Sequence, residues 1–395
     1  MSPAAAVYKA PGEARIITPM SSPYPPPEII ADEAGLERLA RALEPVSAFS
    51  VDTESNSLHA YRERVCLIQI STPEQDFIID PFPLGSDIGP LRAAFADPAR
   101  QKVFHAAEYD ILCLKRDFEI ELTNLFDTMV AARTLGWPQT GLASLLESRF
   151  NIKLDKRFQR ADWGHRPLSE AELDYARMDT RCLLDLRDLM IGELNAVDRL
   201  AEAEEEFARL TRLTPEPPRV DYDAFWRLPG ARELSGHQAA ILSALFQYRE
   251  RQAMQIDLPP FKVIGNETLV QVAQRAPRDQ SELRGIPGMT AGQIRRHGAA
   301  LVDAVRRGSE AQPVRPPRPI PEPDDIRERY ERLRNWRKQK AGRRGVESDV
   351  IIPREALWEL ARRVPRTPED LAQLDHLGPW RRAAYGQELL EILRK

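Results

Sequence analysis

Apolar and polar residues follow two different periods along the chain, and the change between them divides it. From residue 28 to about 210, short apolar runs alternate with helical patterns. The apolar runs predict three early strands, which we expect to be antiparallel, and a later strand at Val103. Helical periodicity predicts two helices before Val103 and mostly helix after it. This pattern is typical of an α/β domain. The early strands are expected at 49–53, 65–70 and 76–79, and the helices at 36–43 and 91–95.

Strand patterns nearly vanish after residue 211, where helical segments are separated by Pro-rich stretches. Residues 214–218 indicate a linker, and residues 313–323 hold six prolines that predict an extended spacer. Shifting the chain by 88 residues superposes Ile264 on Ile352, and Leu269 on Leu357, without a gap. Two copies of one small, all-α helical domain are therefore predicted.

These patterns predict five segments. Residues 1–27 are rich in Pro, Ala and Ser and are expected to be disordered. The α/β domain is expected over 28–212, and a linker with the first helical domain over 213–312. The Pro-rich linker spans 313–323, and the second helical domain spans 324–395.

Three short segments carry acidic groups that local geometry can bring together. Asp52 and Glu54 stand at i and i+2 of a strand, so their side chains share one face. Tyr175 and Asp179 stand one helical turn apart, and Asp110 lies near a predicted helix start. Neighbouring carboxylates repel unless a cation lies between them, and oxygen ligands suit Mg²⁺ or Mn²⁺ better than zinc. Singly, the acidic residues can be turn devices and the tyrosine a core residue.

Composition limits the classes of protein this can be. The hydrophobic share of 42% allows packed cores, and no apolar run approaches the length of a membrane span. The first 27 residues lack the pattern of a signal peptide, so we expect a cytoplasmic protein without a membrane partner. Three cysteines in apolar contexts argue against disulfides and zinc clusters.

A net charge of −4 gives no whole-chain signal for nucleic-acid binding, so any such surface must be local. The second repeat carries a basic strip with Tyr330 and Trp336 interleaved. Basic groups supply phosphate contacts and aromatic rings stack on bases. The alternative is a solvated helix face whose aromatics pack inward. The strip comprises Arg327, Arg329, Arg332, Arg334, Arg337, Lys338, Lys340, Arg343 and Arg344, of which Arg337, Lys338 and Lys340 are our candidate substrate contacts.

The acidic segments resemble the DEDD superfamily of 3′→5′ exonucleases in its tyrosine-containing branch. Residues 52–54, 105–110 and 175–179 match its three motifs in order, and residues 163–169 resemble its Trp-x-x-Arg-Pro-Leu segment. The helical repeats resemble HRDC domains. Residues 28–395 as a whole resemble the ribonuclease D family. The resemblance implies a ribonuclease H-like α/β exonuclease domain followed by two all-α HRDC-like domains.

The resemblance also implies roles for the acidic set and a cofactor of two divalent cations, Mg²⁺ or Mn²⁺. Asp52 would bridge both ions, while Glu54 and Asp179 would complete the ion that carries the attacking water. Asp110 would support the second ion. Tyr175 would orient or deprotonate the attacking water. Orientation is the favoured role, because a phenol with a pKa of about 10 is a weak base at neutral pH unless the metals shift it.

The terminal base of the substrate poses a separate question. Many ribonuclease D sequences have an aromatic residue directly after Asp-Thr-Glu, where this chain has Ser55. Leu58, His59 and Tyr61 are candidates to hold the base instead.

Three further polar residues belong to segments that match the family. His105, at a strand end, and Arg166 are candidate RNA contacts, although for both we favour a structural hydrogen-bonding or ion-pairing role. Asp127 is expected to cap a helix.

The predicted function is a 3′→5′ exoribonuclease that releases nucleoside 5′-monophosphates from RNA. The expected substrates are structured RNAs with a free 3′ end, such as transfer RNA precursors, and a monomer is expected. One alternative is an exonuclease acting on single-stranded DNA, because contacts to the 2′-hydroxyl cannot be located from sequence. Another is a catalytically silent RNA-binding adaptor, against which the four intact acids argue.

Overall fold

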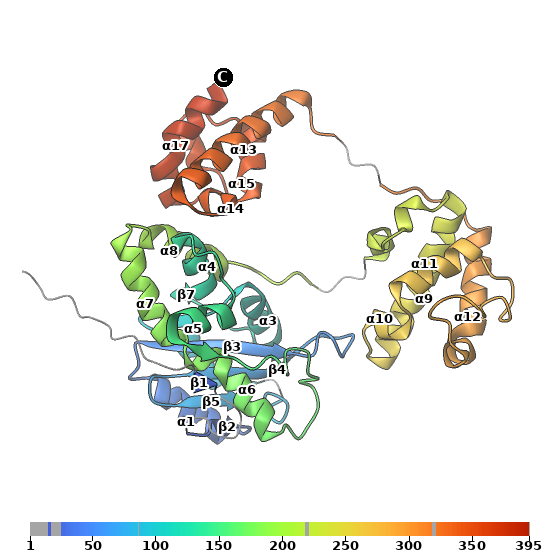
Figure 1. Cartoon of the computed structure of the whole chain (residues 1–395), viewed down its shortest axis with the longest axis horizontal. Helices are drawn as coiled ribbons and strands as arrows, with labels where there is room; N and C mark the ends of the chain where they lie inside the picture. Colours follow the sequence, from blue (N-terminus) through green and yellow to red (C-terminus); the bar gives the residue numbers. More distant parts are fainter. Residues whose placement is uncertain (1–14, 17–24, 86, 218–220, 318–320, 395) are drawn as a thin grey trace, which may run out of the picture. The chain divides into compact units, whose positions relative to one another are not determined.

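A computed structural model describes residues 15–16, 25–85, 87–217, 221–317 and 321–394 (Figure 1). The chain divides into two compact units. The first combines residues 1–54, 65–215 and 322–395, and the second combines residues 55–64 and 216–321. The expectation of disorder over residues 1–27 falls mainly outside the described residues. Residues 214–217 and 311–317 contain neither helix nor strand, as expected for linkers.

The first unit is built on a six-stranded sheet of order β2-β5-β4-β3-β6-β7. β4 and β5 are antiparallel, as predicted, whereas β2–β5, β3–β6 and β6–β7 are parallel pairs. β2 and β7 were not predicted, because three residues are too few to show a period. The strands are β2 (Glu28–Ile30), β3 (Ala48–Ser55), β4 (Val65–Ser71), β5 (Asp76–Ile79), β6 (Gln101–Phe104) and β7 (Leu125–Asp127). A separate parallel pair joins β1 (Arg15–Ile16) to β8 (Ile152–Lys153).

Helices of the same unit pack around this sheet, so the predicted α/β domain is confirmed. Their apolar positions bury into one core with the strands; Leu36, Leu39 and Leu43 of α1 are almost fully buried. Ser169 and Glu172 form a capping box that begins α6. The helices are α1 (Glu33–Leu43), α2 (Gly89–Ala96), α3 (Glu108–Phe118), α4 (Thr128–Leu135), α5 (Leu142–Phe150), α6 (Glu170–Arg181), α7 (Leu183–Ala196) and α8 (Leu200–Thr211).

The predicted repeat is confirmed in the backbone. α13 begins at Asp324, 88 residues after α9 begins at Gly236, and the three later helix pairs keep this offset. Ala276 and Val364, at the ends of equivalent helices, share a left-handed φ of 46° and 47°. The first repeat comprises α9 (Gly236–Ile256), α10 (Pro260–Val263), α11 (Asn266–Arg275) and α12 (Ala291–Glu310), preceded by 3₁₀ turns at Tyr222–Arg227 and Ala231–Glu233. The second comprises α13 (Asp324–Arg344), α14 (Ser348–Ile351), α15 (Arg354–Arg363), α16 (Pro368–Ala372) and α17 (Pro379–Arg394).

Each repeat has its own apolar core. Leu242 and Leu269 are fully buried in the first, and Leu333 and Leu357 in the second. Within the part of the chain that the structure describes, no helix is both long and apolar enough to cross a membrane.

Candidate active site

The C-terminal end of β3 meets the last turn of α6 at a group of three carboxylates. Carboxylate oxygens of Asp52, Glu54 and Asp179 lie within 4.8 Å of one another. Asp52 and Glu54 reach the same group because alternate strand residues share a face, while Thr53 between them is buried on the other. The fold therefore brings together three of the four predicted metal ligands.

Tyr175 lies one turn before Asp179 on α6. Its ring stacks on Trp163 at a centroid distance of 5.9 Å and meets Phe158 edge-on at 5.7 Å. Burial, and then the charges of Asp179 and Glu54, raise the pKa of the Tyr175 phenol above its usual value. The hydroxyl is therefore protonated at neutral pH and can donate a hydrogen bond, which fits an orienting role better than that of a base.

Asp110 occupies the first turn of α3, as predicted, and lies outside the group of three. One of its carboxylate oxygens accepts a hydrogen bond from the Thr53 hydroxyl at 2.5 Å, and the residue is only 6% exposed. Its negative charge nevertheless raises the pKa values of Asp52, Glu54 and Asp179. Asp110 is therefore close enough to contribute to the electrostatics of the same site.

The pKa values of all four acids are raised. Burial is the largest cause: with neighbouring negative charges it raises the pKa of Glu54 to about 9 and those of Asp110 and Asp179 to about 7, and it raises the pKa of Asp52 well above its usual value. Such a cluster is partly protonated at neutral pH unless positive charge compensates it. Closely spaced carboxylate oxygens match the ligand preference of Mg²⁺ and Mn²⁺, so the residues present fit a hard divalent cation.

The turn between β6 and α3 sets the position of Asp110, and Asp127 holds this turn. Ala106 has a left-handed φ of 61°, which is unusual for a residue with a side chain. Asp127 accepts hydrogen bonds from the backbone amides of Ala106 and Ala107, and it also caps α4 as predicted. Asp127 thus stabilises the turn that leads into α3, although it does not belong to the acidic group itself.

His105, in the same turn, contacts the Thr128 hydroxyl through Nδ1 at 2.9 Å. Burial lowers the pKa of His105 to about 4, so the imidazole is neutral at physiological pH. These contacts support the structural role favoured for His105.

Comparisons with known proteins agree with this geometry. The 3′-5′ exonuclease family matches residues 27–195, and the HRDC domain matches residues 238–305 and 327–393. Ribonuclease D of Acidiphilium cryptum is 29% identical over 377 residues, 94% of each chain. The chain thus combines a 3′-5′ exonuclease domain with two HRDC domains, and it is similar to ribonuclease D along almost its whole length.

Solved structures of related exoribonucleases are similar to this chain in both fold and sequence. Escherichia coli RNase D is 26% identical with a TM-score of 0.64, covering 93% of this chain and 98% of that one. The catalytic core of RRP6 from Trypanosoma brucei is 27% identical with a TM-score of 0.67, over 75% and 83%. An exosome complex component 10 homolog of Caenorhabditis elegans is 37% identical over 257 residues, 64% of this chain. The chain spans only 29–48% of the length of that protein and the two RRP6-like proteins of Arabidopsis thaliana.

Arg166, in the Trp-x-x-Arg-Pro-Leu segment of the ribonuclease D family, anchors the loop before α6. Its guanidinium donates to both carboxylate oxygens of Asp80, at 2.5 and 2.9 Å, and to the carbonyl oxygens of Cys66 and Trp163. These contacts consume most of its donors. They favour a structural role over contact with RNA.

The three candidates for the terminal base belong to the second unit. His59 Nδ1 lies 3.1 Å from the ammonium of Lys262, and the Tyr61 hydroxyl lies 3.5 Å from Glu250. Leu58 is 43% exposed. The predicted contact with a terminal base stays a prediction for all three.

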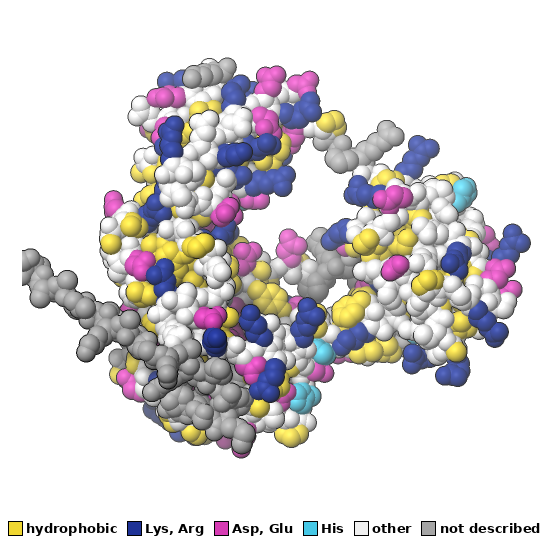
Figure 2. All heavy atoms as spheres, viewed as in Figure 1, with side chains coloured by type: hydrophobic (Ala, Val, Ile, Leu, Met, Phe, Trp, Pro, Cys, Tyr) yellow, Lys and Arg dark blue, Asp and Glu magenta, His cyan; other side chains and the backbone are white. Residues whose placement is uncertain are grey.

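The basic strip of the second repeat is partly engaged within its own domain. Arg337 donates to the carbonyl of Ile352 at 3.1 Å, and Lys340 pairs with Glu388 at 2.6 Å, whereas Lys338 is exposed. Figure 2 shows basic side chains interspersed with acidic ones on the visible face of this repeat. Of the three candidate phosphate contacts, Lys338 fits the prediction best.

Proposed function

We propose that this chain is a 3′→5′ exoribonuclease that hydrolyses phosphodiester bonds at RNA 3′ ends and releases nucleoside 5′-monophosphates. The observation that carries the proposal is the group formed by Asp52, Glu54 and Asp179, with Tyr175 beside it, inside a 3′-5′ exonuclease domain. Ribonuclease D relatives that match 94% and 93% of the chain support RNA as the substrate.

Asp52, Glu54 and Asp179 would hold the cations, and Asp110 would add a fourth carboxylate from α3. Two bound Mg²⁺ or Mn²⁺ ions would lower the pKa of the attacking water and neutralise charge on the leaving oxygen. Tyr175, kept protonated by its surroundings, would donate a hydrogen bond that orients the water. Hydrolysis that starts from a free 3′ end gives one mononucleotide per cycle.

The raised pKa values of the four acids indicate their protonation state before a cation binds. In the absence of a cation the site retains protons, which limits the repulsion among the four carboxylates. Loading with metal would release these protons, so metal affinity should increase with pH. Partly buried carboxylates that repel one another would therefore gain stability from a bound cation.

We further propose that the substrates are structured RNA precursors, with transfer RNA 3′ ends foremost. Escherichia coli RNase D, whose structure resembles this chain, is described as an exoribonuclease involved in structured RNA processing. Sequencing RNA 3′ ends from cells with and without this protein should reveal extended transfer RNA 3′ ends when it is absent. Unchanged transfer RNA ends would contradict this assignment while leaving the exonuclease activity open to direct test.

The activity itself is tested with pure protein, Mg²⁺ and RNA labelled at its 3′ end. We expect labelled mononucleotides as the first product, and no product after addition of a chelator. Asp52→Asn should abolish turnover and retain RNA binding, which separates catalysis from an adaptor role. Internal cleavage, activity in the presence of chelator, or a preference for a matched DNA oligomer would each refute the proposal.

A further inference from the structure

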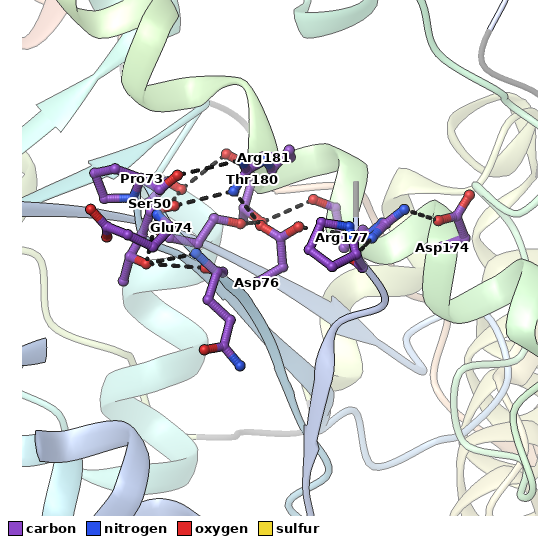
Figure 3. Close-up of polar contacts among 12 residues, drawn as sticks. Ser50, Pro73, Glu74, Asp76, Asp174, Arg177, Thr180 and Arg181 are labelled. Atoms are coloured by element: carbon purple, nitrogen blue, oxygen red, sulfur yellow. Dashed lines mark hydrogen bonds and ion pairs between the residues drawn. The ribbon is translucent and has the colours of Figure 1, made fainter. Parts of the chain in front are cut away.

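One face of α6 holds residues of the candidate active site, and another face holds residues that attach the helix to the sheet. Tyr175 and Asp179 face the acidic group, whereas Arg177, Thr180 and Arg181 project from a different face of the same helix. Arg177 and Thr180 are almost completely buried. Figure 3 shows these three side chains around Asp76 and Ser50, which belong to the strands β5 and β3.

The ionic part of the anchor is centred on Asp76, the first residue of β5, whose side chain is 2% exposed. Arg181 Nη1 lies 3.3 Å from Asp76 Oδ1, and Arg177 Nη1 lies 3.9 Å from Asp76 Oδ2. Arg177 also pairs with Asp174 at 2.5 Å and donates to the carbonyl of Pro25. The Arg177–Asp174 pair lies within α6, whereas the contacts to Asp76 and to Pro25 join the helix to other segments. Because buried charges need partners, these latter contacts restrict how α6 can shift on the sheet.

The second part of the anchor consists of hydroxyl groups adjacent to the metal ligands. Ser50 Oγ donates to the carbonyl of Thr180 at 2.9 Å, and the hydroxyls of Ser71 and Thr180 are 2.7 Å apart. Ser50 lies two residues before Asp52 on the same face of β3, and Thr180 directly follows Asp179. The hydrogen bond therefore joins β3 and α6 one or two residues from two of the predicted ligands.

We propose that Ser50 and Asp76, with their partners on α6, are positioning residues that set the separation between Asp179 and the Asp52–Glu54 pair. Like charges on β3 and α6 repel, and a helix that could move would relieve this repulsion by separating the carboxylates. The anchor prevents that movement and keeps the oxygens close enough to share a cation. This inference rests on the proposed function, because it concerns the metal site on which that function depends.

The test compares Mn²⁺ affinity, measured by titration calorimetry without RNA, in the full-length protein and its variants. Ser50→Ala removes only the hydroxyl, and we expect the Mn²⁺ dissociation constant to rise at least about tenfold, as when groups that orient ligands are lost. The control Thr123→Val removes a hydroxyl that donates to Ala96 at the same 2.9 Å distance, away from α6. It should change thermal stability without changing Mn²⁺ affinity.

A second variant, Asp76→Asn, tests the ionic part of the anchor, and Ser50→Thr, which restores the hydroxyl, should recover most of the lost affinity. Equal Mn²⁺ affinity in the unaltered protein, Ser50→Ala and any folded Asp76→Asn would overturn the inference and leave the proposed function standing. Mn²⁺ binding without RNA hydrolysis by the unaltered protein would refute the proposed function alone. Failure of the unaltered protein to bind Mn²⁺ would refute both.

Discussion

Glu202→Gln should loosen the second HRDC domain from the rest of the first unit. Glu202 lies in α8 with a fully buried side chain. Its two carboxylate oxygens accept hydrogen bonds from the guanidinium of Arg344, at the end of α13, at distances of 2.8 and 2.5 Å. Arg344 also donates to the Tyr385 hydroxyl on α17, so one guanidinium connects three helices.

The expected loss is about 3 kcal/mol. Removing one partner of a buried ion pair costs about 3–5 kcal/mol, because the remaining charge is left uncompensated. The side chain of Arg344 is only 18% exposed, so water can compensate it only in part. The glutamine amide retains one acceptor, which places the loss at the lower end of that range.

Hydrogen exchange of the full-length protein measures this loss where it occurs. A multidomain chain does not unfold in one step, so the relevant quantity is the opening free energy of peptides from α8 and α17. Asp349→Asn is the matched control, because it breaks an ion pair to Arg133 whose side chains are 53% and 34% exposed. The control should cost less than about 1 kcal/mol. Equal protection of α8 and α17 in the two variants would refute the reasoning.

Three further predictions concern the acidic group. Tyr175→Phe should lower RNA turnover at least about 100-fold while leaving Mn²⁺ affinity unchanged; turnover within a few-fold of the unaltered protein would make Tyr175 a packing residue. Thr53→Val removes the hydroxyl that lowers the pKa of Asp110, so that pKa should rise further and more Mg²⁺ should be needed for half-maximal activity at pH about 7. Metal-free protein should melt at lower temperatures as pH rises from about 4 to about 9. The pKa values of Glu54 and Asp179 in the folded protein, about 9 and about 7, exceed those in the unfolded chain. The folded state therefore binds more protons in this pH window and loses stability as the pH rises. A melting temperature that rises with pH, or that falls equally with saturating Mg²⁺, would contradict this assignment.

Local periodicity was sufficient to predict the parts of the site that depend on one element each. Asp52 and Glu54 share a strand face, and Tyr175 and Asp179 lie one helical turn apart, so their relative directions follow from backbone geometry. The repeat was equally accessible, because a fixed offset of 88 residues needs no knowledge of contacts. These features are properties of short segments or of simple sequence identity.

Contacts between segments that are distant in the sequence could not be predicted from local periodicity. The bond from Thr53 to Asp110 depends on a turn with a left-handed Ala106 and on Asp127, which no local period reveals. Arg337 looked free to bind phosphate, yet the carbonyl that it meets lies 15 residues further along. A run of charges shows which groups are available but not which ones the fold has already paired.

The two sides of α6 differ in their electrostatics: like charges surround one side, and ion pairs form on the other. On the side of Asp179, like charges converge and raise one another's pKa values, which weakens the metal-free fold. On the side of Arg177 and Arg181, opposite charges meet at Asp76 and restrict the helix. Carboxylates that are already held close together bind a cation more tightly than carboxylates that must first be brought together. The ion pairs on the Asp76 side of α6 would therefore support the metal site on the Asp179 side. Losing the anchor should therefore relieve the repulsion and, by the same movement, weaken the metal site.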